Sequence, residues 1–183
     1  MTRAELEHVI RAAGTIADDS DVAVIGSQAI LGQFPNAPGE LLVSKEAGVF
    51  PRNHAGRSDM IDGTIGQGSP FEREFGYYAH GVREETAVLP AGWQDRLVLV
   101  SGENTRFVRG WCLEVHDVAI SEYVAGREKD INFTAAIVRH RMVSREVLEQ
   151  RLDATTVDER VRALVRARIV AQFTSGTAPR FPS

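Results

Sequence analysis

Two short segments in the first third of the chain carry residue types that suit phosphate and metal chemistry. Gly26-Ser27 directly follows the apolar run 21–25, and the segment 44–49 carries Glu46. A strand that ends in Gly-Ser and opens a helix brings free backbone N–H groups to the helix N-terminus, where phosphate binds. A second strand beside it, with a carboxylate on one face, can hold a divalent metal against the same phosphates. The alternative is a strand–helix turn that needs a small residue, beside one solvent-facing glutamate.

Helices and strands that alternate along the first part of the chain would position these segments. Leu6 and Val9 belong to a helical repeat of apolar residues that predicts a helix over 3–17. Short apolar runs bounded by Gly, Pro or Asp predict strands at 21–25, 40–50, 75–89, 96–100 and 108–115. Ser27 is the predicted N-cap of a helix after the first strand, and another helix is predicted over 58–65.

The character of the chain changes after residue 116, where strand signals end. Helices are predicted over 117–126, 128–142, 145–153 and 157–173. The fold class is therefore α+β, with a small mixed β-sheet, flanking helices and a helical C-terminal cap. We predict an α/β core over 1–116, a helical cap of the same domain over 117–173 and a flexible tail over 174–183.

The composition is that of an ordinary globular protein. The chain has 183 residues, of which 43% are hydrophobic and 25% charged, which excludes a disordered chain and a disulfide-stapled scaffold. The net charge of −4 gives no general attraction to nucleic acid or anionic membranes. Cys112 is the one cysteine, which suits a reducing compartment, and no export signal or spanning apolar run is present. We expect a cytoplasmic protein without a membrane partner, and the preference for Arg over Lys indicates a bacterial source.

The order of the motifs resembles that of a known superfamily. Gly26-Ser27 and Glu46 match the Gly-Ser pair and the first residue of the acid–any–acid motif in nucleotidyltransferase-like domains of the polymerase-β superfamily. Within it, the chain is most similar to the AbiEii/MNT type, which is associated with toxin–antitoxin and phage-abortive systems. Gly48 stands where the second acid is expected, and His80 is the nearest candidate for the third. Three other residues remain alternatives for the third acid: Glu84, Glu85 and Glu114.

The segment 116–130 extends the resemblance into the helical region. AbiEii-like proteins usually carry a lysine in the first helix of this segment and then an Arg-x-Lys-Asp run. Arg127, Lys129 and Asp130 match that run, whereas Glu122 stands where the lysine is expected.

The resemblance implies that the protein binds an NTP with Mg²⁺ or Mn²⁺ and transfers a nucleotidyl group to RNA, protein or a small molecule. It also implies a possible antitoxin partner. The implied nucleotide-binding residues are Gly26, Ser27, Arg127 and Lys129. The implied metal ligands are Glu46 and His80, and the implied catalytic residues are Glu46 and Asp130, with Asp130 orienting one of the basic side chains.

The departures from the family pattern keep a second function open. Mg²⁺ prefers oxygen ligands, so Glu46 with Gly48 and His80 is a poor Mg²⁺ site and favours Mn²⁺ or Zn²⁺. The alternative is therefore a catalytically degenerate module that binds nucleotide or protein, such as one component of a toxin–antitoxin pair.

Overall fold

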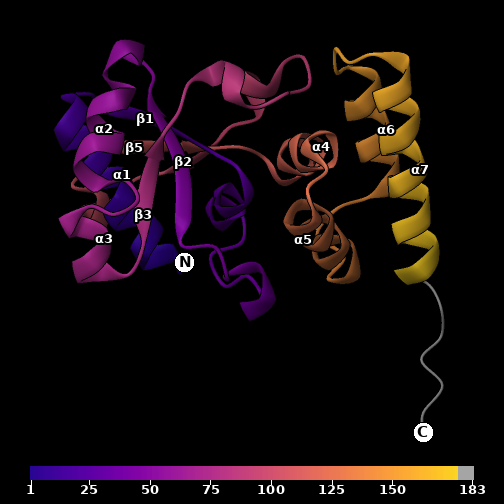
Figure 1. Ribbon diagram of the computed structural model, residues 1–183, viewed down its shortest axis with the longest axis horizontal. Helices are drawn as coiled ribbons and strands as arrows, with labels where there is room; N and C mark the ends of the chain where they lie inside the picture. The colour runs from indigo at the N-terminus through magenta and orange to yellow at the C-terminus, as the bar shows by residue number, and fades with distance from the viewer. Residues whose placement is uncertain (177–183) are drawn as a thin grey trace, which may run out of the picture.

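The computed structural model describes residues 1–176 and is built around a five-stranded mixed sheet (Figure 1). The strands are β1 (Asp21–Ile25), β2 (Glu46–Pro51), β3 (Tyr78–Gly81), β4 (Val98–Val100) and β5 (Arg109–Cys112). Their order is β3-β2-β1-β5-β4. β1 pairs antiparallel with β2 and parallel with β5, β2 pairs parallel with β3, and β4 pairs antiparallel with β5. The predicted α+β class with a small mixed sheet is confirmed.

Helices lie on both sides of this sheet (Figure 1). One side carries α1 (Arg3–Ala17), α2 (Ser58–Ile65) and α3 (Pro70–Phe75). The other side carries α4 (Val115–Ala125), α5 (Glu128–Arg139), α6 (Arg145–Asp153) and α7 (Glu159–Gly176). The short 3-10 helix η1 (Ser27–Gly32) contacts β2, β5 and α4, so it joins the sheet to this second group.

The core follows from the sequence pattern. Every residue of β1 is buried, as expected for a central strand covered on both faces. The apolar repeat of α1 places Leu6 and Val9 in the same core, and Thr2 with Glu5 forms a capping box at the helix start. Gly110 allows α1 to approach β5 closely, since a Cβ there would lie 2.4 Å from Cδ1 of Ile10.

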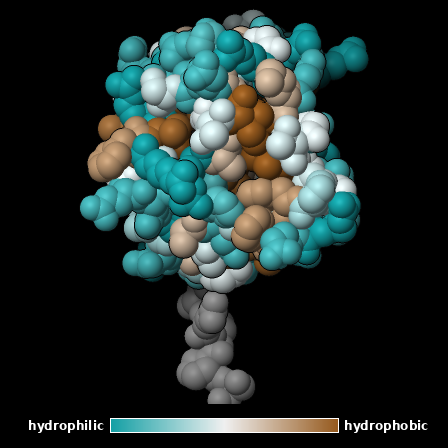
Figure 2. All heavy atoms as spheres, turned by 90° about the vertical axis from the view of Figure 1, so that its left-hand side faces the viewer, coloured by the Kyte–Doolittle hydropathy of each residue, from teal (hydrophilic) through white to brown (hydrophobic). Residues whose placement is uncertain are grey.

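The side of the molecule that carries α1–α3 is shown in Figure 2. Hydrophilic side chains surround a smaller group of apolar ones there. Met60 of α2 and Phe75 of α3 are both exposed. Within residues 1–176, no helix combines the length and apolarity needed to cross a bilayer.

Several predicted elements differ from the observed ones. The strand predicted over 40–50 begins only at Glu46, because a 3-10 turn at Gly39–Leu41 and a loop precede it. The strand predicted over 75–89 is confined to Tyr78–Gly81, and α3 was not predicted. The signal for α3 was present, since Ser69 caps it and a proline follows at its first position.

The helices of the C-terminal part agree more closely with the prediction. α6 has the predicted bounds, and α4 and α5 begin and end within three residues of theirs. α7 continues to Gly176, beyond the predicted end at 173, so the first part of the segment expected as a tail is helical. The remainder of that segment, 177–183, lies outside the described residues.

Candidate functional site

A pocket of about 980 Å³ lies between one edge of the sheet and the α4–α5 pair. Its walls come from the residues that follow β1, the loop that leads into β2, the end of β3, and α4–α5. All the site residues expected from the sequence line it: Gly26, Ser27, Glu46, His80, Arg127, Lys129 and Asp130. Segments that are far apart in the chain therefore meet in one cavity.

The Gly26-Ser27 turn differs from the expected helix start. Gly26 has φ 76°, a left-handed conformation that favours glycine, and a Cβ there would meet nothing within 4 Å. The backbone conformation, and not crowding, therefore requires glycine at this position. Ser27 was expected to cap an α-helix, but it is the first residue of the six-residue 3-10 helix η1 and makes no capping bond. Gly26 occupies the cap position because the chain turns there.

Glu46 and His80 lie side by side on adjacent strands. β2 and β3 pair so that Glu46 stands opposite Tyr78 and Gly48 opposite His80. The Tyr78 hydroxyl donates to Glu46 Oε2 at 3.2 Å, and His80 Nδ1 lies 3.4 Å from Glu46 Oε1. Burial and the nearby Glu46 carboxylate raise the pKa of Tyr78, so its hydroxyl stays a donor. The pair is a partly exposed polar patch on the sheet side of the pocket.

This patch does not fit a Mg²⁺ site. Among residues 1–176, no three His, Cys, Asp or Glu side chains gather as metal ligands would. At Gly48, where a second carboxylate was expected, a Cβ would lie 3.3 Å from Cγ1 of Ile25 and 3.8 Å from Cγ2 of Val82. A side chain at this position would therefore press lightly on Ile25, while its contact with Val82 would be an ordinary one. Glu46 and His80 alone supply one oxygen-bearing group and one nitrogen, short of the oxygen-rich shell that Mg²⁺ requires.

The three alternative carboxylates do not complete the set. None of Glu84, Glu85 and Glu114 lines the pocket. The first two lie in an exposed 3-10 turn after β3. Glu114 caps α4 by accepting the backbone N–H of His116 at 3.0 Å, and its other oxygen lies 2.7 Å from Nδ1 of the same histidine. Its carboxylate is thus used within the fold.

The opposite wall of the pocket is formed by the turn from α4 to α5. Arg127 precedes α5, and its Nε and Nη2 donate to the Asp130 carboxylate at 2.7 and 3.1 Å. The Arg127 backbone N–H donates to the same carboxylate at 3.0 Å. Burial acts to raise the pKa of Asp130, but the hydrogen bonds from Arg127 prevail and lower it, so Asp130 is ionised. Asp130 thus holds the Arg127 guanidinium and backbone N–H with three hydrogen bonds.

Glu122 is the residue whose part in this wall the sequence did not reveal. Its side chain lines the pocket, is 8% exposed and contacts the Asp130 carboxyl. Burial, followed by the hydrogen bond and the negative charge of Asp130, raises the pKa of Glu122 to about 8. The raised pKa favours the protonated form of the Glu122 carboxyl, the form that has a hydrogen to donate to Asp130. The sequence marked only that Glu122 departs from the lysine of the family pattern.

Two further basic residues line the pocket, Lys129 and Arg139, and they differ in whether a carboxylate pairs with them. Lys129 is exposed and forms no ion pair with any carboxylate of residues 1–176. Arg139 pairs with Glu40, and Nε2 of His140 lies 2.6 Å from the other oxygen of Glu40. The hydrogen bonds from His140 and Arg139 lower the pKa of Glu40. No sequence signal predicted this contact, because its members are about a hundred residues apart and meet only through the packing of α5.

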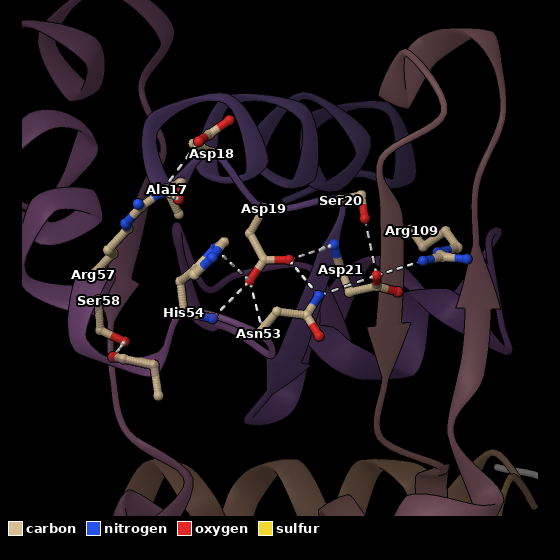
Figure 3. Close-up of polar contacts among 11 residues, drawn as sticks. Ala17, Asp18, Asp19, Ser20, Asp21, Asn53, His54, Arg57, Ser58 and Arg109 are labelled. Atoms are coloured by element: carbon tan, nitrogen blue, oxygen red, sulfur yellow. Dashed lines mark hydrogen bonds and ion pairs between the residues drawn. The ribbon is translucent and has the colours of Figure 1, made fainter.

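A second polar cluster lies at the opposite end of β1 (Figure 3). Asp19 accepts from the backbone N–H groups of Asn53 and His54 at 2.8 and 3.0 Å, and from that of Asp21 at 2.9 Å. Asp21 accepts from Arg109 and from the indole N–H of Trp111. Burial acts to raise the pKa of Asp21, but its hydrogen bonds outweigh burial, that from Arg109 foremost, and lower the pKa to about 2. Because donors of the protein itself hydrogen-bond to the oxygens of both carboxylates, we assign this cluster to the stability of the fold.

Comparison with known families agrees with the motif evidence. The family described as nucleotidyltransferase of unknown function (DUF6036) has a model that matches residues 4–174. The match includes the whole sheet and both helices that wall the pocket. No curated protein and no solved structure matches the chain.

Proposed function

Because the chain belongs to this nucleotidyltransferase family, we propose that the pocket between the sheet and α4–α5 binds a nucleoside triphosphate. One observation carries the proposal: the Gly26-Ser27 turn, the Glu46–His80 patch and the Arg127–Asp130 corner line the same cavity. The volume of about 980 Å³ falls in the range of small-molecule sites.

Arg127 and Lys129 supply positive charge for the phosphates. Arg127 uses Nε and Nη2 to bind Asp130, so Nη1 takes no part in that contact and can donate to a phosphate oxygen. The Arg127 side chain is 63% exposed, which leaves it accessible to a ligand. Lys129 adds a second positive charge that no carboxylate of the described residues compensates.

The remaining walls suit the nucleoside. Apolar side chains from the ends of β1 and β3, the loop before β2 and α5 give a surface for a planar base: Ile25, Leu41, Val43, Val82 and Phe133. Glu46 and His80 offer hydrogen-bond acceptors to hydroxyl groups of the sugar or of an acceptor. The pocket therefore has a basic corner and an apolar side, as a nucleotide requires.

A specific observation favours binding without transfer. Nucleotidyl transfer in this superfamily relies on carboxylates that hold divalent metal, but Gly48 stands at the position of the second carboxylate and no three possible metal ligands gather among residues 1–176. We therefore propose a nucleotidyltransferase-like protein that binds nucleotide and has lost, or strongly reduced, the transfer reaction. Incubation with each labelled NTP, Mg²⁺ or Mn²⁺ and total cellular RNA and protein tests this, and label on any acceptor would restore the enzyme as the better function.

The AbiEii/MNT resemblance extends the proposal to partners. In a toxin–antitoxin system of a bacterial cytoplasm, the partner would be a small antitoxin that binds over the nucleotide-filled pocket. In an active relative, RNA or protein would be the acceptor of the nucleotidyl group. Co-expression with the product of the adjacent gene, followed by affinity purification, tests for such a partner.

Calorimetric titration with each of the four NTPs tests the binding site itself. We expect Lys129→Ala to weaken binding about tenfold, because it removes an uncompensated positive charge from the pocket. Lys45→Ala is the matched control, since Lys45 is the other lysine of the chain, is exposed and does not line the pocket. Equal affinity of the two variants for every NTP would refute the site, as would absence of binding at millimolar ligand.

A further inference from the structure

We propose that Glu122 is a positioning residue of the nucleotide pocket: its protonated carboxyl group donates to Asp130, and loss of that proton weakens nucleotide binding. The inference rests on the proposed function, because it concerns the same pocket. It goes further by assigning a role to Glu122, which stands where AbiEii-like proteins carry a lysine.

The geometry places Glu122 behind the residues that would contact the ligand. Glu122 lies in the last turn of α4, where its backbone carbonyl accepts the N–H of Gly126 at 2.9 Å. Gly126 has φ 65° and turns the chain directly into Arg127. The short connection brings the first turn of α5 back against α4, so the Glu122 and Asp130 carboxyl groups meet. Both residues are buried, at 8% and 1% exposure, and each contributes to the pKa of the other.

Asp130 links Glu122 to the pocket. One carboxyl group contacts Glu122, the Arg127 backbone and two nitrogens of the Arg127 guanidinium. A proton on Glu122 makes this contact a hydrogen bond between an acid and a carboxylate. Without it, two carboxylates of like charge share one guanidinium at close range, and the orientation of Arg127 is no longer fixed.

The charged groups around Glu122 set the balance between its protonated and ionised forms. From α5 and the turn before it, Asp130 opposes ionisation of Glu122, while Arg127 and Lys129 favour it. From α7, the Arg168 guanidinium donates to the Tyr123 carbonyl at 2.9 Å, beside the same turn.

The other elements that pack against α4 contribute little. Arg151 of α6 faces Asp117 at 3.2 Å, and η1 contains no charged residue. Across the pocket stand Glu46 beside His80 and the Glu40–Arg139 ion pair, and neither contributes to the pKa of Glu122. Burial and Asp130 outweigh the cations and raise the pKa of Glu122 to about 8. The proton is therefore present at neutral pH and leaves in the mildly alkaline range.

The charge of the corner changes with that proton. With Glu122 neutral, Arg127, Lys129 and Asp130 sum to one positive charge. With Glu122 ionised the sum is zero, and an anionic ligand loses that attraction. The sign is fixed by linkage, because a phosphate at Arg127 opposes ionisation of Glu122 and raises its pKa further. Nucleotide binding should therefore take up protons near pH 8.

The test is calorimetric titration with ATP from about pH 7 to about pH 9 for the wild type, Glu122→Gln, Glu122→Ala and Glu128→Gln. We expect the wild type to lose about tenfold in affinity over this range. Glu122→Gln keeps a neutral donor to Asp130 and should bind as the wild type does at pH 7, without that loss at pH 9. Glu122→Ala removes the donor and should bind more weakly at both values. Glu128→Gln removes an exposed charge in the same turn and should follow the wild type.

The outcomes separate this inference from the proposed function. Absence of ATP binding in every variant at pH 7 would refute the proposed function and the inference together. Binding by the wild type with the same pH profile in Glu122→Gln would refute the inference alone. Proton uptake, measured in buffers of different ionisation enthalpy, gives a second readout. It should be seen in the wild type near pH 8 and be absent in Glu122→Gln, and equal uptake in both would overturn the assignment of the proton to Glu122.

Discussion

The two ends of β1 carry polar clusters of opposite kinds. At its start, Asp19 and Asp21 accept hydrogen bonds from backbone and side-chain donors of neighbouring segments, and little acceptor capacity is left (Figure 3). At its end, beyond Ile25, the polar groups face a pocket, and Lys129 and Nη1 of Arg127 have no carboxylate partner among the described residues. A polar group buried in a fold must be satisfied by the fold, whereas a binding site keeps part of its capacity for the ligand.

The contrast teaches which carboxylates to assign to function. Asp19 is as polar and as buried as Asp130, and its neighbours include a histidine and an asparagine, so residue types alone would make it a candidate site. The kind of partner separates them. Asp130 holds the guanidinium of Arg127, which lines the pocket and keeps Nη1 outside that contact, whereas Asp19 accepts from backbone N–H groups and the Asn53 amide. Substitutions at the start of β1 should therefore change stability, and substitutions at its end should change ligand binding.

The largest effect is expected at Asp19. Asp19→Ala would remove the acceptor for the backbone N–H groups of Asn53 and His54 and leave them unsatisfied. The buried N–H of Asp21, which donates to the same carboxylate, would lose its acceptor as well. A buried unsatisfied group costs about 1–3 kcal/mol and a partly buried one less, so the free energy of unfolding should fall by about 3–5 kcal/mol. Urea denaturation measures it, with Asp18→Asn as the control because the Asp18 side chain is 91% exposed and asparagine tolerates the left-handed φ of 48° at this position. Equal midpoints for the two variants would mean that the cluster does not hold the fold.

Ile25 comes next, at the boundary between the two regions. It is 4% exposed at the end of the central strand, so Ile25→Ala should cost about 2–5 kcal/mol of unfolding free energy as a core truncation. Val43→Ala serves as control, because Val43 lines the same pocket but is 79% exposed. A denaturation midpoint unchanged by Ile25→Ala would show that this strand end is not core.

The pH dependence of stability sharpens the comparison at Asp21. Its pKa is lowered from 3.8 to about 2 in the folded protein, so the carboxylate stabilises the fold above pH 4. That contribution is lost as the pH falls from about 4 through about 2, and we expect it to amount to about 1–2 kcal/mol. Asp21→Asn should abolish this part of the acid-induced loss in urea melts recorded between pH 5 and pH 2. A wild-type profile retained by the variant would assign the acid sensitivity elsewhere.

Gly48→Asp tests whether the pocket at the end of β1 can be turned into a metal site. The new side chain would press on Ile25, and overpacking of this kind costs about 1–3 kcal/mol. We expect a lower melting temperature that Mg²⁺ and Mn²⁺ do not restore, because Glu46 and the new carboxylate would still lack a third oxygen-bearing ligand among the described residues. Stabilisation of the variant by millimolar metal, absent in the wild type, would show that the site lacks only one ligand.

The smallest effect on stability is expected at Lys129. Lys129→Ala removes an exposed side chain without an ion pair and should leave the free energy of unfolding within about 0.5 kcal/mol of the wild type. Thermal denaturation measures it, and a larger loss would move Lys129 from the ligand site to the structural framework.

The sequence predicted the parts of this account that depend on local pattern. The apolar runs gave β1 and β5, and Gly26-Ser27 marked the turn that opens the pocket. The pattern failed where tertiary contacts decide. The residues 40–45 are apolar enough for a strand, but they form a 3-10 turn and a loop that wall the pocket.

The chemistry of the site shows the same division. Arg127 and Asp130 pair within one helical turn, so their contact follows from spacing. The protonation of Glu122 follows from its burial against a neighbouring helix, which no local pattern encodes. The Asp19 cluster was missed for a related reason, since Asn53 reaches it only because β2 runs antiparallel to β1.

One measurement compares both ends of β1 in a single experiment. In a two-dimensional amide NMR titration of the wild type with ATP, we expect shifts at residues 26–28, 46–48 and 127–130, which lie in or beside the pocket walls. The amide signals of Asp19, Asn53 and His54 should not shift, because each of these N–H groups already donates to an acceptor within the fold. Shifts confined to the Asp19 cluster, or no shifts at millimolar ATP, would contradict the assignment of nucleotide binding to the pocket at the end of β1.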